Sequence, residues 1–167
     1  MSPLDWATHP LKKYADFSGR APLAEYWWFY LLVLIVYIVA MIVDSIVGVA
    51  VFGPYGVVTL LAILTLLVPS IAAGVRRLHD TNRTGWWMAA PLVPYCIGFA
   101  MMGPAITNPV AMASGDADTG SLGIAMIFLL IGGIFALVVF IFTVLQGTTG
   151  PNKYGDDPYA GGASRAM

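Results

Sequence analysis

The fold is decided by one stretch of sequence, Arg76-Arg77-Leu78-His79-Asp80-Thr81-Asn82-Arg83-Thr84-Gly85-Trp86-Trp87, which lies between two long apolar runs. Three arginines, one histidine and one aspartate fall within its first eight residues. Charge of this density between apolar segments is typical of a short cytoplasmic loop between helices that cross a membrane. We therefore predict that residues 76–85 form a cytoplasmic loop of a polytopic membrane protein.

The composition agrees with a membrane location. Of the 167 residues, 59% are hydrophobic and 10% are charged, and the mean hydropathy is +0.80. Soluble domains usually carry about 25% charged residues, so this chain lacks the polar surface that would cover a globule. The net charge of −1 gives no global basic field for nucleic acid. The single cysteine, Cys96, lies in an apolar run and cannot form an internal disulfide.

Four apolar runs are long enough to cross a bilayer, since a span needs about 20 residues at ~1.5 Å each. They are Trp27–Phe52, Val57–Val75, Trp86–Met102 and Leu122–Leu145. No signal-peptide core precedes the first run, so we take it as a retained helix. We expect an all-α fold, a four-transmembrane-helix bundle that forms a single membrane domain over residues 1–167, with an N-terminal interfacial helix and an external loop at 103–121.

Basic residues set the orientation of the spans. Each of the eight lies before the first span, between the second and third spans, or after the fourth span. They are Lys12, Lys13, Arg20, Arg76, Arg77, Arg83, Lys153 and Arg165. Four crossings place all of them on one side, so both termini are predicted to be cytoplasmic. Aromatic residues at Tyr26-Trp27-Trp28 and Trp86-Trp87 stand where the chain would leave the cytoplasm, the depth that such rings favour.

The segment Tyr14–Trp27 carries the first polar motif. Ser18-Gly19 indicates a turn, and Pro22 suits the first turn of a helix. One interpretation is an interfacial helix that anchors the bundle. The other pairs Glu25, favoured at a helix N-terminus, with an arginine of the central loop.

The central arginines also have two interpretations. They are a topology signal with ordinary headgroup contacts, or they bind a phosphate or carboxylate, for which guanidinium forks are suited. The candidate anion site consists of Arg20, Arg76, Arg77, Arg83 and Asn152, whose segments the four-span topology brings to one face. His79 and Asp80 could act as an acid–base pair, although sequence neighbours need not face each other.

Three motifs in this order resemble one family. They are Phe17-Ser18-Gly19-Arg20 with Glu25-Tyr26-Trp27, then Arg76-Arg77-Leu78-His79-Asp80 with Gly85-Trp86-Trp87, then Gly150-Pro151-Asn152-Lys153-Tyr154-Gly155-Asp156. The chain is similar, from about Tyr14 to Pro158, to the small bacterial inner-membrane proteins catalogued as domain of unknown function 805. It departs from them at Pro22-Leu23-Ala24, where a basic residue is common, and at Thr84, usually serine. The resemblance implies a multi-pass inner-membrane protein without an established activity.

Polar and helix-breaking residues also occur inside the spans. Tyr30, Tyr37 and Asp44 recur every seven residues, on one helix face. A carboxylate in a span is a candidate for function, but Asp44 stands near the end of its span, where a capping role is the alternative. Pro69, Pro91 and Pro94 each interrupt helical hydrogen bonding. A helix broken in this way can line a substrate cavity, or it can have a simple kink whose free backbone groups bind neighbouring side chains. Gly132 and Ala136 suit close helix packing within or between subunits.

Three function classes follow from these features. The leading hypothesis is a non-enzymatic protein whose cytoplasmic face binds an anionic lipid headgroup or a partner's acidic segment. The alternative is a small transporter or channel, which requires a homo-oligomer because four helices rarely enclose a solute path. The third is a lipid-modifying enzyme using His79 and Asp80, which lack an accompanying nucleophile. No motif for a metal or an organic cofactor is present in the sequence.

The topology is testable with single cysteines in a Cys96→Ser background, using a membrane-impermeant thiol reagent on intact cells. Residue 81 should stay unlabelled from outside, and residue 116 should react. Labelling at 81, or protection at 116, would contradict the four-span orientation.

Overall fold

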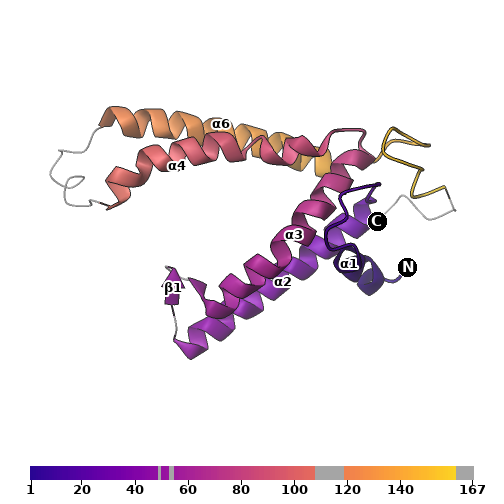
Figure 1. Cartoon of the computed structure of the whole chain (residues 1–167), viewed down its shortest axis with the longest axis horizontal. Helices are drawn as coiled ribbons and strands as arrows, with labels where there is room; N and C mark the ends of the chain where they lie inside the picture. The colour runs from indigo at the N-terminus through magenta and orange to yellow at the C-terminus, as the bar shows by residue number, and fades with distance from the viewer. Residues whose placement is uncertain (49, 53–54, 108–118, 161–167) are drawn as a thin grey trace. The chain divides into compact units, whose positions relative to one another are not determined.

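The computed structural model describes residues 1–48, 50–52, 55–107 and 119–160 (Figure 1). Its elements in chain order are helix α1 (Pro3–Lys12), helix α2 (Leu23–Val47), strands β1 (Ala50–Phe52) and β2 (Tyr55–Gly56), helix α3 (Val57–Asp80), the 3₁₀ helix η1 (Gly85–Ala89), helix α4 (Leu92–Thr107) and helix α6 (Thr119–Val144). The two short strands pair antiparallel.

Four helical segments are long and apolar enough to cross a membrane: Leu23–Val47, Val57–Asp80, Gly85–Gly103 and Gly120–Val144. The predicted all-α membrane fold with four spans is confirmed. Many apolar side chains of these segments are exposed, as expected where lipid rather than protein covers a helix.

The N-terminal helix lies earlier in the chain than predicted. We expected it within Tyr14–Trp27, but α1 covers Pro3–Lys12 and begins with a capping box between Ser2 and Asp5. Residues 13–22 are not helical. Pro22 stands just before α2, at the N-cap, and not inside its first turn. The capping box satisfies free N–H groups at the start of α1, which explains why the helix begins there.

The first span ends before its predicted limit at Phe52. Gly48 adopts a left-handed conformation with φ 72°, and its N–H donates to Asp44 O at 2.9 Å. The buried Asp44 carboxylate accepts hydrogen bonds from the backbone N–H groups of Val58 (3.0 Å) and Thr59 (2.8 Å). A carboxylate there caps the N-terminus of α3 and favours its dipole. Of the two roles left open for Asp44, these contacts support the capping role.

The second span continues past its predicted end at Val75, since α3 runs to Asp80. Arg83 N donates to Leu78 O and Asn82 N to His79 O, each at 2.9 Å, while Asn82 has φ 59°. This is a Schellman motif with asparagine at the left-handed position. The first half of the predicted loop 76–85 is therefore helical, and residues 81–84 make the turn into η1.

The third span is interrupted where the prolines predict it. η1 ends at Ala89, and α4 begins at Leu92 with Pro94 in its first turn, where the missing N–H removes no helical hydrogen bond. The helix extends to Thr107, so the start of the predicted external loop 103–121 is helical. Residues 108–118 of that loop, and Arg165, lie outside the described residues.

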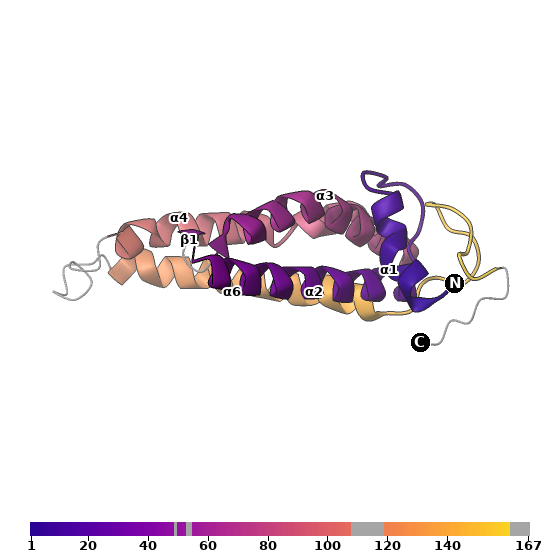
Figure 2. The ribbon, with the colours of Figure 1, turned by 90° about the horizontal axis from the view of Figure 1, so that it is seen from below.

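Internal contacts divide the chain into two compact units. Unit 1 comprises residues 1–85 and 143–167, and it has α1 packed on α2 and α3 around a core of Phe29, Val33 and Ala73. Unit 2 comprises residues 86–142, where α4 and α6 run alongside each other (Figures 1 and 2). Gly132 permits this approach, because a Cβ there would lie 2.7 Å from the Tyr95 ring. That residues 1–167 form one domain stays a prediction.

A side chain repairs the interruption at Pro69 in α3. Proline has no N–H, so Thr65 O lacks its usual helical donor. The hydroxyl of Tyr14, from the segment after α1, donates a hydrogen bond to Thr65 O. A polar group left unpaired in a span is costly, and this contact therefore ties the N-terminal segment to α3.

Substitution Tyr14→Phe should reduce stability in detergent by about 1–3 kcal/mol, the cost of leaving a backbone acceptor without a donor in an apolar medium. In a Pro69→Ala background the new N–H can donate to Thr65 O, so the same substitution should then have a smaller effect. A double-mutant cycle of thermal unfolding measures the difference. Equal effects of Tyr14→Phe in both backgrounds would contradict the repair.

Candidate functional site

The three polar motifs meet at the C-terminal end of α3. The centre is Asp80, fully buried in unit 1 between two arginines. Arg20 Nε and Nη2 each lie 2.9 Å from Asp80 Oδ1. Arg77 Nη1 donates to Asp80 Oδ2. The carboxylate thus joins a residue of the N-terminal motif to one in its own helix.

Arg77 also caps the end of α6. It is fully buried, its Nε donates to Thr143 O at 3.0 Å, and its Nη2 donates to Leu145 O. A third bond runs from Nη1 to Ala21 O at 3.3 Å. The last carbonyls of a helix lack internal donors and carry partial negative charge, so a guanidinium is favoured there.

The segment that follows α6 closes around the same point. Arg20 donates to Thr148 O (2.6 Å) and Gly150 O (2.7 Å). In return, Thr148 donates through N–H (2.9 Å) and hydroxyl (3.1 Å) to Asp80 O, and Asn152 donates to His79 O at 3.0 Å. Gly147 touches Asp80 so closely that a Cβ would lie 2.0 Å from Oδ2. The C-terminal motif therefore caps α3.

A second ion pair lies beside the first. Arg76, fully buried, has its Nη2 3.1 Å from Glu25 Oε1, which is the pairing predicted for Glu25. His9 Nδ1 of α1 lies 3.0 Å from the other oxygen of Glu25. Arg76 Nη1 donates to Asp16 O. Hydrogen bonds from the hydroxyl and then the N–H of Ser18 lower the pKa of the Asp16 carboxyl, which is ionised at neutral pH and adds a negative charge nearby.

His79 and Asp80 contact different partners. The His79 ring stacks on Tyr154, with centroids 3.8 Å apart and an interplanar angle of 5°, and its Nδ1 lies 3.1 Å from Gly19 O. Lys153 Nζ lies over the Tyr154 ring, 4.9 Å from its centre. Asp80 faces the arginines. These contacts give the two residues structural roles and do not support an acid–base pair.

The remaining predicted residues are dispersed. Arg83, half-buried, donates to Thr81 O at 3.1 Å beyond the end of α3. Tyr30 is 52% exposed beside Trp27, whereas Tyr37 packs against the α2–α3 core. Asp44 caps the opposite end of α3 from Asp80. Tyr30, Tyr37 and Asp44 therefore do not gather into one polar site.

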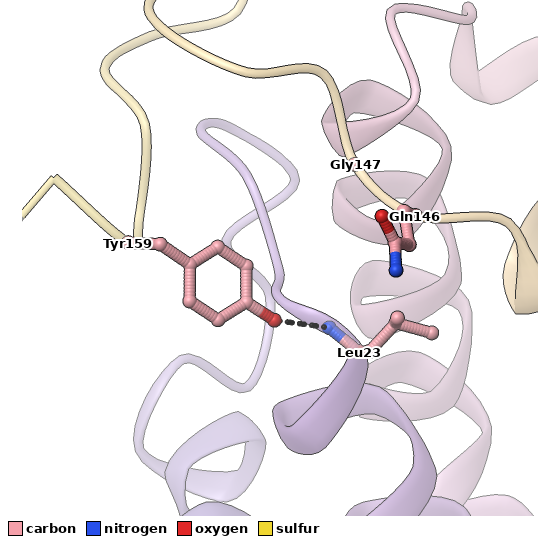
Figure 3. Close-up of a pocket in the computed structure, with 4 residues that line it drawn as sticks. All are labelled: Leu23, Gln146, Gly147 and Tyr159. Atoms are coloured by element: carbon pink, nitrogen blue, oxygen red, sulfur yellow. Dashed lines mark hydrogen bonds between the residues drawn. The ribbon is translucent and has the colours of Figure 1, made fainter. Parts of the chain in front are cut away.

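A small pocket opens beside the network, lined by Leu23, Gln146, Gly147 and Tyr159 (Figure 3). Tyr159 Oη accepts a hydrogen bond from Leu23 N at 3.2 Å and so caps the start of α2. Its volume is about 10 Å³, room for a water molecule at most and far less than the roughly 300–1,000 Å³ of small-molecule sites. Across the described ranges, no three His, Cys, Asp or Glu side chains lie close enough together to hold a metal ion.

Sequence reasoning missed several partners of this network. His9, Tyr14, Gly147, Thr148 and Tyr159 were not singled out, although each contacts a motif residue or a helix end. Gly147 and Thr148 follow directly after the last apolar run, where helix-end chemistry is a usable signal. No local pattern marks His9 or Tyr14, because their partners are distant in the chain.

The chain matches the family model described as "Protein of unknown function (DUF805)" over residues 14–156. It is 31% identical over 158 residues to "Inner membrane protein YhaI" of Escherichia coli (strain K12), covering 95% of this chain and 98% of that protein. It is 29% identical over 155 residues to "Inner membrane protein YhaH" of the same strain, covering 93% and 97%. No solved structure matches it significantly.

Removing either buried carboxylate should strongly destabilise unit 1. Asp80→Asn and Glu25→Gln each leave buried arginines without a counter-charge, so each should reduce unfolding free energy by about 3–5 kcal/mol. Asp156→Asn is the control, since this exposed aspartate should change stability by less than about 0.5 kcal/mol. Thermal unfolding in detergent compares the three. Similar losses in all three variants would contradict the structural role of the ion pairs.

Proposed function

This chain belongs to the DUF805 family, and we propose that it is an inner-membrane protein that binds anionic phospholipid headgroups at the C-terminal end of α3. We propose that the headgroups contact the cations around the buried ion pairs, and not the buried arginines themselves. The proposed headgroup ligands are Lys12, Lys13, Arg83 and Lys153.

The observation that carries the proposal is where these four residues lie. Three of them are connected to the last turns of α3: Lys13 through its carbonyl, 3.4 Å from Arg76 Nη1, Lys153 through the Tyr154–His79 stack, and Arg83 through its N–H to Leu78 O. Lys12 immediately precedes Lys13 and is exposed. Cations beside a span attract anionic headgroups, and each contributes about 1 kcal/mol near such a surface.

This proposal narrows the five-residue anion site inferred from the sequence. Arg20, Arg76 and Arg77 are buried and donate to carboxylates and backbone carbonyls within unit 1. Asn152 donates to His79 O and Thr148 Oγ1. A phosphate would have to displace these internal acceptors. We therefore assign the three arginines and Asn152 a structural role and keep only Arg83 of the five as a proposed ligand.

We propose that this end of the protein faces the cytoplasm, together with both termini. All seven Lys and Arg residues within the described ranges belong to α1, the segment after it, the end of α3, the turn after α3 or the segment after α6. The positive-inside bias acts on such juxtamembrane residues, and it supports the orientation.

The test compares anionic lipid retained by the purified protein in mild detergent, measured by native mass spectrometry. A variant with Lys12, Lys13, Arg83 and Lys153 all changed to Gln should retain several-fold less anionic lipid at an unchanged melting temperature, since four favourable contacts are lost. The matched control, Asp5→Asn with Asp156→Asn, removes exposed charges of opposite sign and should retain at least as much lipid as the wild type.

The variant Arg77→Lys tests whether Arg77 has a structural role or binds headgroups. Lysine cannot reproduce the donor fork of arginine, so this variant should melt at a lower temperature, while its folded fraction keeps wild-type lipid. A wild type without anionic lipid, or a quadruple variant with undiminished lipid, would refute the proposed function.

A further inference from the structure

Helix α1 presents an apolar face that no described residue of unit 1 covers. Its packed face, Ala7 and Pro10, is buried. Leu4 and Leu11, seven residues apart and thus on one helix face, are 74% and 37% exposed. Asp5 and Lys12 are also seven residues apart, and each follows one of the leucines, so they form a neighbouring polar face. The helix therefore has separate protein-facing, apolar and charged surfaces.

The side chain of Tyr14, in the segment after α1, reaches to the depth of the membrane. Tyr14 donates to Thr65 O, and Thr65 is the ninth of the 24 residues of α3. At ~1.5 Å per residue the helix measures about 36 Å, and hydrocarbon of about 30 Å leaves only about 6 Å of it outside. Thr65 lies roughly 12 Å from one helix end and 22 Å from the other. Its carbonyl is therefore within the hydrocarbon, and the Tyr14 hydroxyl reaches it there.

The exposed apolar surface continues from α1 into this segment. Tyr14 and Phe17 are 41% and 43% exposed. Lys12 and Lys13 stand between Leu11 and Tyr14, so cations and apolar side chains are neighbours along this part of the chain. Helices that lie in a membrane interface combine such leucine and aromatic faces with basic residues.

We propose that α1 is an in-plane membrane helix, with Leu4 and Leu11 inserted at the headgroup–acyl boundary and Asp5 and Lys12 among the headgroups. The occupant of its apolar face is phospholipid of the same leaflet. The contact between His9 and Glu25 fixes the helix to α2, so α1 inserts as a docked part of unit 1. This insertion does not require selectivity for anionic lipid, and so it stands independently of the proposed function.

Nitroxide labels on single cysteines in the full chain, with Cys96→Ser, test the insertion by power-saturation spectroscopy. The labelled variants are Leu4→Cys, Leu11→Cys, Asp5→Cys and Lys12→Cys. Leu34→Cys on the exposed surface of α2 serves as the lipid reference, and Asp156→Cys as the aqueous reference. Labels at 4 and 11 should be several-fold more accessible to oxygen, relative to a nickel chelate, than labels at 5 and 12.

The measurement is made in phosphatidylcholine vesicles and again with phosphatidylglycerol added. Insertion in both compositions supports the in-plane helix even if headgroup selectivity fails, which separates this inference from the proposed function. If a leucine variant melts below the parent protein, Thr8→Cys, one helical turn from Leu4, replaces it. The inference is overturned if labels at 4 and 11 are as accessible to nickel as those at 5 and 12. It is also overturned if they are shielded from both reagents, which would indicate a protein partner.

Discussion

The rest of unit 1 depends on the need to neutralise the buried arginines beside Asp80. A buried charge without a partner is far more costly than one that is paired and hydrogen-bonded. Asp80 receives Arg20 from the N-terminal segment and Arg77 from its own helix, and its backbone oxygen receives Thr148 from the segment after α6. Three parts of the chain that are distant in sequence must therefore assemble together, because each supplies a group that the others leave unpaired.

Arginine suits this position for a geometric reason. Arg20 and Arg77 each donate to a carboxylate and to at least two backbone carbonyls in different directions, which the planar guanidinium fork permits. Lysine would supply the same charge without that donor geometry. The three buried arginines and the two carboxylates, Glu25 and Asp80, leave one positive charge, which the nearby Asp16 carboxylate and the carbonyls at the end of α6 offset. The arginine motif is therefore explained largely by folding, and the proposed headgroup binding is assigned to cations outside the buried pairs.

Helix α3 also shows how a span with irregular backbone is completed by other segments. Asp44 caps its first N–H groups, Tyr14 satisfies the carbonyl that Pro69 leaves without a donor, and Thr148 and Asn152 bind its last carbonyls. Each contact pairs a backbone group that would otherwise be unsatisfied in or near hydrocarbon. The Tyr14 contact also attaches the N-terminal segment to α3, and this attachment supports the proposed level of the exposed leucines of α1.

The sequence by itself determined the membrane class, the number of spans and the break at Pro91 and Pro94, because these follow from local composition, run length and proline chemistry. It also offered the pairing of Glu25 with the arginine motif as one of two interpretations, and the structure contains that pair. Only the tertiary structure decided that α3 passes through Arg76 and Arg77, that Asp80 and not a phosphate receives Arg20 and Arg77, and that Asp44 is a cap. The physical reason is that distant donors and acceptors decide where a helix ends and which residue pairs with a buried charge. No local sequence pattern specifies which distant groups will pack there.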